Sequence, residues 1–213
     1  MYYYIFGALL IMVGVWTIGS YLVIKNLEEP DYSVIEKKNG YEIRQYAPYI
    51  IAETEVSGNY SETLNQGFGV IADYIFGNNT SKTSIAMTAP VLQNESEKIA
   101  MTVPVINTLQ DEQTRTVSFV LPSKYTLETL PEPNNDKVTL TEVPARTVAA
   151  LRFTWYASEE RVSKKQELLL QKLSDDNYTV NGSIQVAQYN PPLSMPAIRR
   201  NEIIVPITNE VLE

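Results

Sequence analysis

A seven-residue pattern of alternating apolar and small positions occurs twice near the middle of the chain. The first copy, residues 85–91, reads IAMTAPV, and the second, residues 99–105, reads IAMTVPV. Alternate side chains of a strand point to opposite faces, so Met87 and Met101 fall on the apolar faces of their copies. The polar stretch 93–97 between them is typical of a hairpin loop. The pattern predicts two antiparallel strands whose methionine-bearing faces coincide.

The opposite face of this predicted hairpin carries only Ala, Thr and Pro. Small side chains allow a helix, a second sheet or a flat ligand to approach the backbone closely. Pro90 and Pro104 lack a backbone N–H, so each is expected at a strand end, a bulge or an edge. Met87 and Met101 therefore have two interpretations, either as gap-filling core residues or as residues that line a ligand site.

The first segment of the chain is apolar on every side. Tyr2–Ile24 contains no charged residue, and as a helix it would span roughly 34 Å, enough to cross a bilayer. A cleavable signal peptide is the alternative, but the segment shows no clear basic start, short apolar core or A-x-A-like cleavage site. Lysines follow the segment at positions 25, 37 and 38 and none precedes it, which favours a cytoplasmic domain. We expect a single-pass anchor over residues 2–25.

Residues 26–31 form a short charged linker, and the domain that follows, 32–208, combines predicted strands with two amphipathic helices. Ser61 is the predicted N-cap of the first helix, which ends near Phe76, and Ser158 caps the second. Gly67 and Gly69 lie inside the first helix, where glycine is unfavourable but permits close packing on a sheet. The predicted strands in the rest of the domain are residues 41–46, 49–56, 115–121, 137–143, 146–155, 183–189 and 203–207, and the predicted loops are 107–114 and 122–136.

The apolar stripes of the two predicted helices match at a constant spacing. Positions 64, 68, 71 and 75 of the first helix correspond, 98 residues later, to positions 162, 166, 169 and 173 of the second. The strands that precede each helix match at about the same offset. This pattern indicates two diverged copies of a strand–strand–helix–strands unit, with a break near residue 130.

Composition excludes several classes of function. The chain of 213 residues contains no histidine and no cysteine, so Ser-His-Asp and Cys-His catalysis, disulfides and the usual structural zinc sites are excluded. The formal net charge is -8 and no basic run occurs, which argues against a nucleic-acid partner. An enzyme of this composition would have to work with carboxylates, Tyr, Lys, Ser or Thr alone.

Three sequence motifs follow one another along the domain. They are the doubled IAMTxPV pattern, the opening Tyr41-Glu42-Ile43-Arg44-x-Tyr46, and Tyr189-Asn190-Pro191-Pro192 leading to Arg199-Arg200-Asn201-Glu202. Together they resemble the SOUL haem-binding protein family, over nearly all of residues 32–207. The resemblance implies an α+β domain, with a twisted, mostly antiparallel sheet or distorted barrel built from two pseudo-symmetric halves and flanked by two helices. More distantly, the architecture is similar to that of bacterial effector-binding domains.

The resemblance also implies a hydrophobic site for haem or a related tetrapyrrole, which we expect between the curved sheet and the first helix. Some family members are thought to ligate haem iron through histidine, which this chain lacks; Met, Tyr and Cys are the other usual ligands, so a methionine or a tyrosine remains open. We expect a loose apolar pocket with weak or no axial ligation. The arginines are candidate partners of the propionates, or ordinary salt-bridge partners of surface carboxylates. The predicted ligand-binding residues are Arg44, Tyr60, Phe68, Met87, Met101, Tyr189, Met195, Arg199 and Arg200.

Three functional hypotheses follow. The first is a membrane-anchored tetrapyrrole-binding protein that acts as a carrier, buffer or sensor, with residues 2–24 in the lipid bilayer and no catalytic or metal-ligating residues of its own. The second is a carboxylate-based hydrolase, for which Glu53 and Glu55 share a strand face, although alternate charges on an exposed strand face are common. The third is an effector-type binding module for another apolar small molecule or a protein partner.

Overall fold

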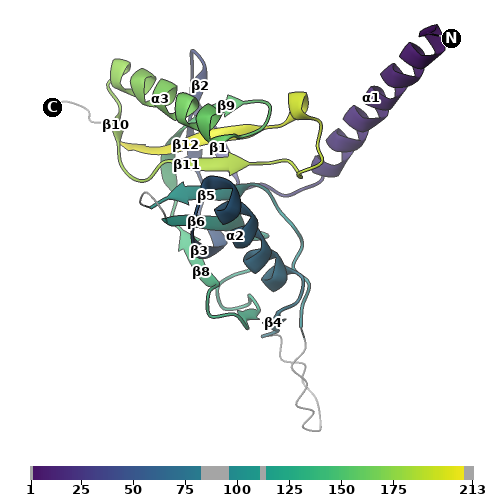
Figure 1. The fold of residues 1–213 in the computed structure, drawn as a ribbon. Helices are drawn as coiled ribbons and strands as arrows, with labels where there is room; N and C mark the ends of the chain where they lie inside the picture. The colour runs from purple at the N-terminus through teal and green to yellow at the C-terminus, as the bar shows by residue number, and fades with distance from the viewer. Residues whose placement is uncertain (1, 83–95, 111–113, 209–213) are drawn as a thin grey trace.

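The computed structural model describes residues 2–82, 96–110 and 114–208 (Figure 1). Within them the chain is α+β, as predicted, with three α-helices and a strongly curled antiparallel sheet. The helices are α1 (Tyr2–Ile24), α2 (Tyr60–Ile75) and α3 (Glu159–Asp175), with a 3-10 turn, η1 (Pro196–Ile198). The strands are β1 (Tyr32–Lys38), β2 (Tyr41–Tyr46), β3 (Tyr49–Ser57), β4 (Asn79–Thr80), β5 (Val105–Leu109), β6 (Thr114–Val120), β7 (Glu132–Pro133), β8 (Thr139–Val143), β9 (Arg146–Phe153), β10 (Thr179–Val180), β11 (Gln185–Gln188) and β12 (Asn201–Thr208).

The main sheet has ten strands and two similar halves. Its order is β1-β2-β9-β12-β11-β5-β6-β3-β8, with β10 paired to β12, while β4 and β7 form a separate pair. β5 and β11 meet at the centre, and on either side the order runs outward through β6, β3 and β8 or through β12, β9 and β2. The half that contains β5 therefore takes β8 from the second half of the sequence, and the half that contains β11 takes β1 and β2 from the first. This arrangement agrees with the predicted pseudo-symmetry, while the sequence repeat at an offset of 98 residues stays an interpretation.

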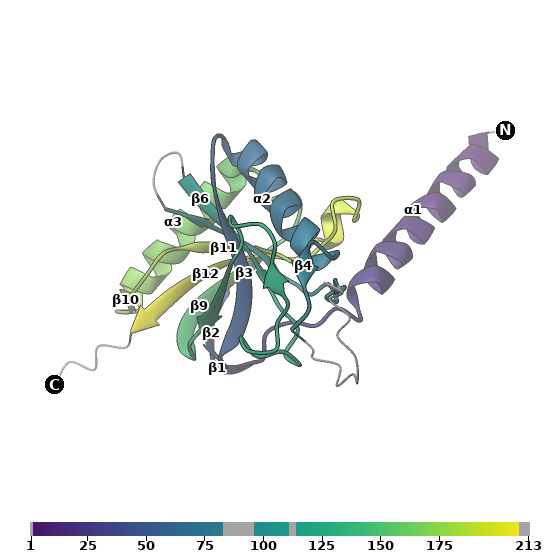
Figure 2. The same ribbon diagram turned by 90° about the horizontal axis from the view of Figure 1, so that it is seen from below.

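Both helices of the domain cover the same face of the sheet, as both ribbon views show (Figures 1 and 2). The register explains why, because directly paired residues share a face. Ile203 pairs with Val186, Val186 with Asn107, and Asn107 with Val117, so one row crosses four strands beneath the helices. The neighbouring row lies on the opposite face, which points away from α2 and α3 and is called the open face below. This row runs from Glu202 through Ala187 and Ile106 to Ser118. The two larger buried clusters lie between the first row and the helices, whereas the second row faces away from them and contributes Ala187 and Ile106 to two smaller buried clusters.

The first helix of the domain is close to its predicted position but begins at a different cap. Asn59 is the N-cap of α2, since its side chain accepts a hydrogen bond from the Glu62 backbone N–H at 3.0 Å, so the prediction of Ser61 was wrong. Both residues belong to the N-cap class, and the sequence does not fix the first helical residue between them. The prediction for Ser158 is confirmed, because its side chain accepts from the Arg161 N–H at the start of α3.

The predicted methionine hairpin is wrong in its second strand. Its first strand, 85–91, lies outside the described residues, whereas residues 99–104 form no strand beyond a single bridge at Thr102, and β5 begins only at Val105. The reason lies in the backbone hydrogen bonds. The Ile99 N–H donates to the end of α2, the Val103 N–H donates to Glu28 in the linker, and Pro104 has no N–H. The predicted loop 107–114 is also wrong, since residues 107–109 belong to β5.

Candidate functional site

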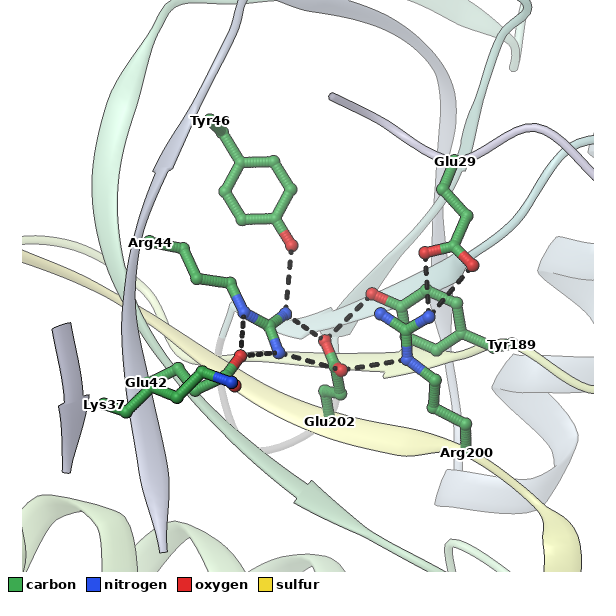
Figure 3. A network of polar contacts seen from close by, with 8 residues as sticks. All are labelled: Glu29, Lys37, Glu42, Arg44, Tyr46, Tyr189, Arg200 and Glu202. Carbon is green, nitrogen blue, oxygen red and sulfur yellow. Dashed lines mark hydrogen bonds and ion pairs between the residues drawn. The ribbon is translucent and has the colours of Figure 1, made fainter. Parts of the chain in front are cut away.

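A buried ion-pair network on the open face of the sheet brings together three of the predicted site residues (Figure 3). Its centre is Glu202 of β12, whose side chain is fully buried. Arg44 of β2 donates from Nη1 and Nη2 to the two Glu202 oxygens at 2.7 and 3.2 Å. Arg200 donates from Nε at 2.9 Å, and the Tyr189 hydroxyl donates at 2.9 Å. Arg44, Tyr189 and Arg200 therefore form one site, organised by a carboxylate.

Each arginine of this network has a second carboxylate partner besides Glu202. Arg44 also forms an ion pair with Glu42 at 2.8 Å, and Arg200 Nη1 binds both carboxylate oxygens of Glu29 at 2.9 and 2.8 Å. Burial would raise the pKa of Glu202, but the hydrogen bonds from Arg44 and the charges of both arginines outweigh it, so its pKa is lowered. Because each arginine has its own carboxylates, the network offers little positive charge to an anionic ligand.

Aromatic rings enclose the network and add to its rigidity. The Arg200 guanidinium carbon lies 3.7 Å from the centre of the Tyr189 ring, and that of Arg44 lies 4.5 Å from the Tyr32 ring. Burial raises the pKa of Tyr46 to about 12, although its hydrogen bond from Arg44 acts in the opposite direction. A cavity of about 370 Å³ borders this network, with Glu42, Arg44, Arg200 and Glu202 in its wall. Its charged lining residues other than Arg152 are paired with one another, which suits a structural role.

A second site lies on the helix-covered face, in a groove between the N-terminal ends of α2 and α3. The groove has a volume of about 610 Å³, and its apolar wall includes Tyr60, Leu64, Tyr156, Ala157 and Pro192. Its polar lining residues are Asn59, Ser61, Asn65, Ser158, Glu159, Gln188 and Arg199. Two residues predicted from the sequence, Tyr60 and Arg199, therefore meet here.

Arg199 differs from the two arginines of the open face. It is 7% exposed, yet no carboxylate among the described residues lies within ion-pair distance of it. Its guanidinium donates to the backbone carbonyls of Ser194, at 3.2 Å, and Pro192, and it lies 4.5 Å from the Tyr156 ring centre. Burial lowers the pKa of Arg199 from its ordinary value, with Tyr156 acting in the opposite direction. The groove thus contains a buried cation without an anionic partner in the described part of the chain.

Unsatisfied polar groups lie next to this groove. The Tyr60 hydroxyl and both polar side-chain atoms of Asn107 are buried, and they form no hydrogen bond of normal geometry in the described residues, although the Asn107 amide is close enough to act on the pKa of Tyr60. Burial raises the pKa of Tyr60 to about 12, although Arg115, 4.8 Å from the Tyr60 ring centre, and the Asn107 amide act in the opposite direction. Buried polar groups are normally hydrogen-bonded, and of these two residues Tyr60 lines the groove.

Comparison with known families matches residues 27–206 to the SOUL heme-binding protein family. The chain belongs to this family. SOUL proteins are a family of binding proteins. The human protein named heme-binding protein 2 is 27% identical over 172 residues, covering 80% of this chain and 79% of the human one. The mouse protein of the same name is 25% identical over 190 residues, covering 86% and 88%.

The fold itself also occurs in more distant proteins. The C-terminal domain of EcmrR, a solved structure, superposes with a TM-score of 0.59, covering 84% of this chain and 98% of that domain at 10% sequence identity. At this identity the likeness concerns the fold alone. The sequence-based expectation of a SOUL domain is confirmed, whereas the similarity to effector-binding domains stays a prediction.

The remaining predicted residues of this SOUL chain are spread over other places. Phe68 is 37% exposed and packs on Phe119, with ring centres 5.2 Å apart, outside the lining of the groove. Met101 is also 37% exposed and lines no described cavity. The Met195 sulfur accepts a hydrogen bond from Thr17 of α1 at 2.7 Å. Met87 lies outside the described residues. The structure thus brings Tyr60 and Arg199 together in one place, and Arg44, Tyr189 and Arg200 in another.

The expected recess does not lie beneath α2. Ile71 and Ile75 are buried against the sheet, and a Cβ on Gly67 would overlap Val117, so helix and sheet are packed together. The space lies at the N-terminal end of α2 instead. Sequence reasoning missed Tyr156 as part of it, because Tyr156 was assigned to no element.

The acidic pair considered for a hydrolase lies on the open face. Glu53 and Glu55 both line a groove of about 600 Å³, and the Thr141 hydroxyl donates to Glu53 at 2.6 Å. No cluster of three or more acidic residues suited to a metal ion occurs within the described ranges. Nothing in this arrangement activates either carboxylate as an acid or a base.

Proposed function

We propose that this SOUL protein is a membrane-anchored, non-catalytic binding protein for haem or a related tetrapyrrole, and that the groove between α2 and α3 holds the ligand. The observation that carries this proposal is Arg199, a buried cation beside an apolar wall with no carboxylate partner in the described residues. A charge placed in this way is stabilised when a ligand supplies an anion, because an unpaired buried charge is costly. A ligand with an apolar body and a carboxylate at its edge fits both properties.

The lining of the groove supports this class of ligand. A volume of about 610 Å³ lies within the range of about 300–1,000 Å³ typical of small-molecule sites. Tyr156 and Leu64 would contact the flat apolar part of a tetrapyrrole, while Arg199 would donate hydrogen bonds to a propionate. Tyr60 would hold a second polar group once its ring moves, since its hydroxyl is buried at present. The two curated relatives are named heme-binding proteins, which agrees with this choice.

We further propose that iron ligation by this chain is weak or absent. The sequence has no histidine or cysteine. Met101 lies away from the groove, and the Met195 sulfur is engaged with α1. Haem would supply an iron centre whose ligation state is visible by absorbance, whereas the residues of the groove bind its edge and limit the access of water to it.

The proposed anchor is α1, with the domain on the cytoplasmic side. The helix has no charged residue, is long and apolar enough to cross a bilayer, and has only Ser20 buried. Such exposure is unfavourable in water for a helix of this length but suits a lipid environment. The weak lysine bias that follows α1 supports the orientation.

The test is a haemin titration of the full chain in lipid nanodiscs, read by the Soret absorbance against empty nanodiscs. We expect saturable binding, and an affinity loss of about 10-fold or more in Arg199→Gln, since a charge-assisted hydrogen bond contributes about 1.5–3 kcal/mol. Arg152→Gln is the matched control, because Arg152 is exposed and points to the open face. A flat titration would exclude the tetrapyrrole.

A thermal-shift screen of other apolar anions would then identify an effector-type ligand, because a ligand that binds the native state raises the melting temperature.

A further inference from the structure

The segment between β11 and β12 contacts the transmembrane-type helix directly. It carries η1 and lies beside the domain-proximal part of α1 in both ribbon views, where it is drawn in yellow (Figures 1 and 2). Trp16 Nε1 donates to the Leu193 carbonyl at 2.8 Å, and the Met195 backbone N–H donates to the Ser20 hydroxyl at 3.0 Å. Thr17 donates to the Met195 sulfur at 2.7 Å. These three hydrogen bonds hold the segment against one face of α1.

These contacts determine the depth of the segment relative to a membrane. A helix rises about 1.5 Å per residue, so Trp16 lies about 12 Å along the axis from Ile24, the last residue of α1. The hydrocarbon core of a bilayer is about 30 Å thick, which is close to the length of α1. If α1 spans a bilayer, a segment bonded at Trp16 and Ser20 lies at or within the boundary of the membrane, on the side of the domain.

The composition of the segment suits this depth. Residues 191–198, PPLSMPAI, contain no charge, and the first charged side chain after them is Arg199. Leu193, at the tip, is 86% exposed, more than any other large apolar side chain described outside α1. A long apolar side chain so exposed has no stabilising contact within the domain. Burial of the Leu193 side chain would therefore stabilise a contact with a partner outside the domain.

Two aromatic side chains extend the same surface. Trp155 is 53% and Tyr156 51% exposed. Both residues contact the segment. The backbone N–H of Trp155 donates to the Pro196 carbonyl at 3.0 Å. Arg199 lies against the Tyr156 ring and donates to the Pro192 carbonyl. Trp and Tyr are enriched at membrane–water interfaces, because an apolar ring and a polar tip suit that region.

We propose that residues 191–198, together with Trp155 and Tyr156, form a second membrane-contacting surface that inserts Leu193 into the bilayer beside α1. This rests on the proposed role of α1 as an anchor. The surface is continuous with α1 through the hydrogen bonds of Trp16, Thr17 and Ser20, so whatever surrounds that part of α1 also reaches Leu193. Lipid is therefore the partner. The contact would hold the domain in one orientation, with the Arg199 groove opening next to the membrane surface, because Pro192 lines that groove.

The absence of cysteine from the chain provides a direct test. Single-cysteine variants of the full chain carry an environment-sensitive fluorophore, are reconstituted into phosphatidylcholine vesicles, and are quenched by lipids brominated along the acyl chain. Ile18→Cys reports on α1, Leu193→Cys on the tip, and Leu168→Cys is the matched control, because Leu168 is 38% exposed on α3. We expect at least two-fold quenching at positions 18 and 193 and little at position 168. A label at Tyr156→Cys should be quenched as well, and less so when Leu193→Glu is added.

The outcomes separate this inference from the anchor itself. Quenching at position 18 without quenching at 193 and 156 would overturn the second contact and leave the anchor standing. An unquenched label at position 18 would overturn both. A label at 193 that is shielded from aqueous iodide but unaffected by brominated lipid would show that protein covers the surface, and would also overturn the proposal.

Discussion

Gly67 of α2 lies against Val117 of β6 so closely that a Cβ on the glycine would come 2.5 Å from Val117 Cγ2. This contact holds the middle of α2 tightly on the sheet. It also determines where the open space lies, because the helix can leave a groove only at its N-terminal end. Gly69, two residues later, has nothing within 4 Å of the corresponding position.

Replacement of Gly67 by alanine should destabilise the fold. Overpacking a tight contact costs about 1–3 kcal/mol, and the better helix propensity of alanine offsets about 1 kcal/mol of this. We expect a net loss of up to about 2 kcal/mol in the free energy of unfolding, measured by chemical denaturation of the full chain in a mild detergent. Gly69→Ala is the control and should stabilise the protein by up to about 1 kcal/mol. Equal effects at the two positions would show that α2 does not depend on the Val117 contact.

The sequence predicted most of the fold because most of its signals are local. The strand over Tyr41–Tyr46 and the cap at Ser158 follow from alternation and from side-chain chemistry within a few residues. The segment at 99–104 was mispredicted for the opposite reason. Its alternation is real, but its N–H groups bond to the end of α2 and to Glu28, which no local pattern reveals. β1, Tyr32–Lys38, was also not predicted, since its residues are mainly exposed and it is bulged against β2.

The candidate site was predictable in residue type but not in grouping. Arg44, Arg199 and Arg200 were equivalent in the sequence, and only the fold separates them. Glu202, two residues after Arg200, neutralises the two arginines on the open face, whereas Arg199 points to the other face. Arg199 and Arg200 directly precede β12, and Arg199 has extended backbone angles, so these two successive side chains face opposite ways. The partner carboxylate on Glu29 lies 171 residues away, beyond any pattern in one sequence.

The cap of α2 can be tested by one pair of substitutions. Asn59→Ala should cost about 1 kcal/mol of unfolding free energy, because the Glu62 N–H loses its hydrogen-bond acceptor. Ser61→Ala should change stability by less than about 0.5 kcal/mol, since Ser61 is exposed and lies inside the first turn. Thermal or chemical unfolding of both variants measures the difference. A larger loss at Ser61 than at Asn59 would contradict the cap seen in the structure.

The Glu202 network should be the most sensitive polar cluster of the domain. Glu202→Gln leaves the charges of Arg44 and Arg200 without their common partner, and removal of one member of a buried ion pair costs about 3–5 kcal/mol. Glu42→Gln is the matched control, because Glu42 pairs with the same arginine but is partly exposed, and its loss should cost about 1 kcal/mol or less. Unfolding free energies of both variants at pH 7 test this ranking.

The same carboxylate makes stability depend on acid pH. The pKa of Glu202 is lower in the folded protein than its ordinary value of about 4.3 in an unfolded chain. The stabilisation of the folded protein by the ionised Glu202 carboxylate is therefore fully present above about pH 4.3. It is lost as the pH falls through the pKa of Glu202 in the folded protein. We expect the stability difference between the native protein and Glu202→Gln to be constant from pH 7 to about pH 5 and to shrink below pH 4. A difference that grows on acidification would contradict the lowered pKa.

Substitution of the methionines tests whether a methionine sulfur binds haem iron. Met101 is remote from the Arg199 groove, and the sulfur of Met195 already accepts a hydrogen bond from Thr17, so neither is positioned to bind iron in the groove. Met101→Leu and Met195→Leu retain the volume and apolar character of methionine and remove only the sulfur. If ligation is weak or absent, both variants should bind haemin within two-fold of the native affinity and with an unchanged Soret maximum, whereas Arg199→Gln weakens binding. A displaced Soret maximum in one methionine variant alone would identify that sulfur as an iron ligand, and the groove would then have to be reassigned to the surroundings of that methionine.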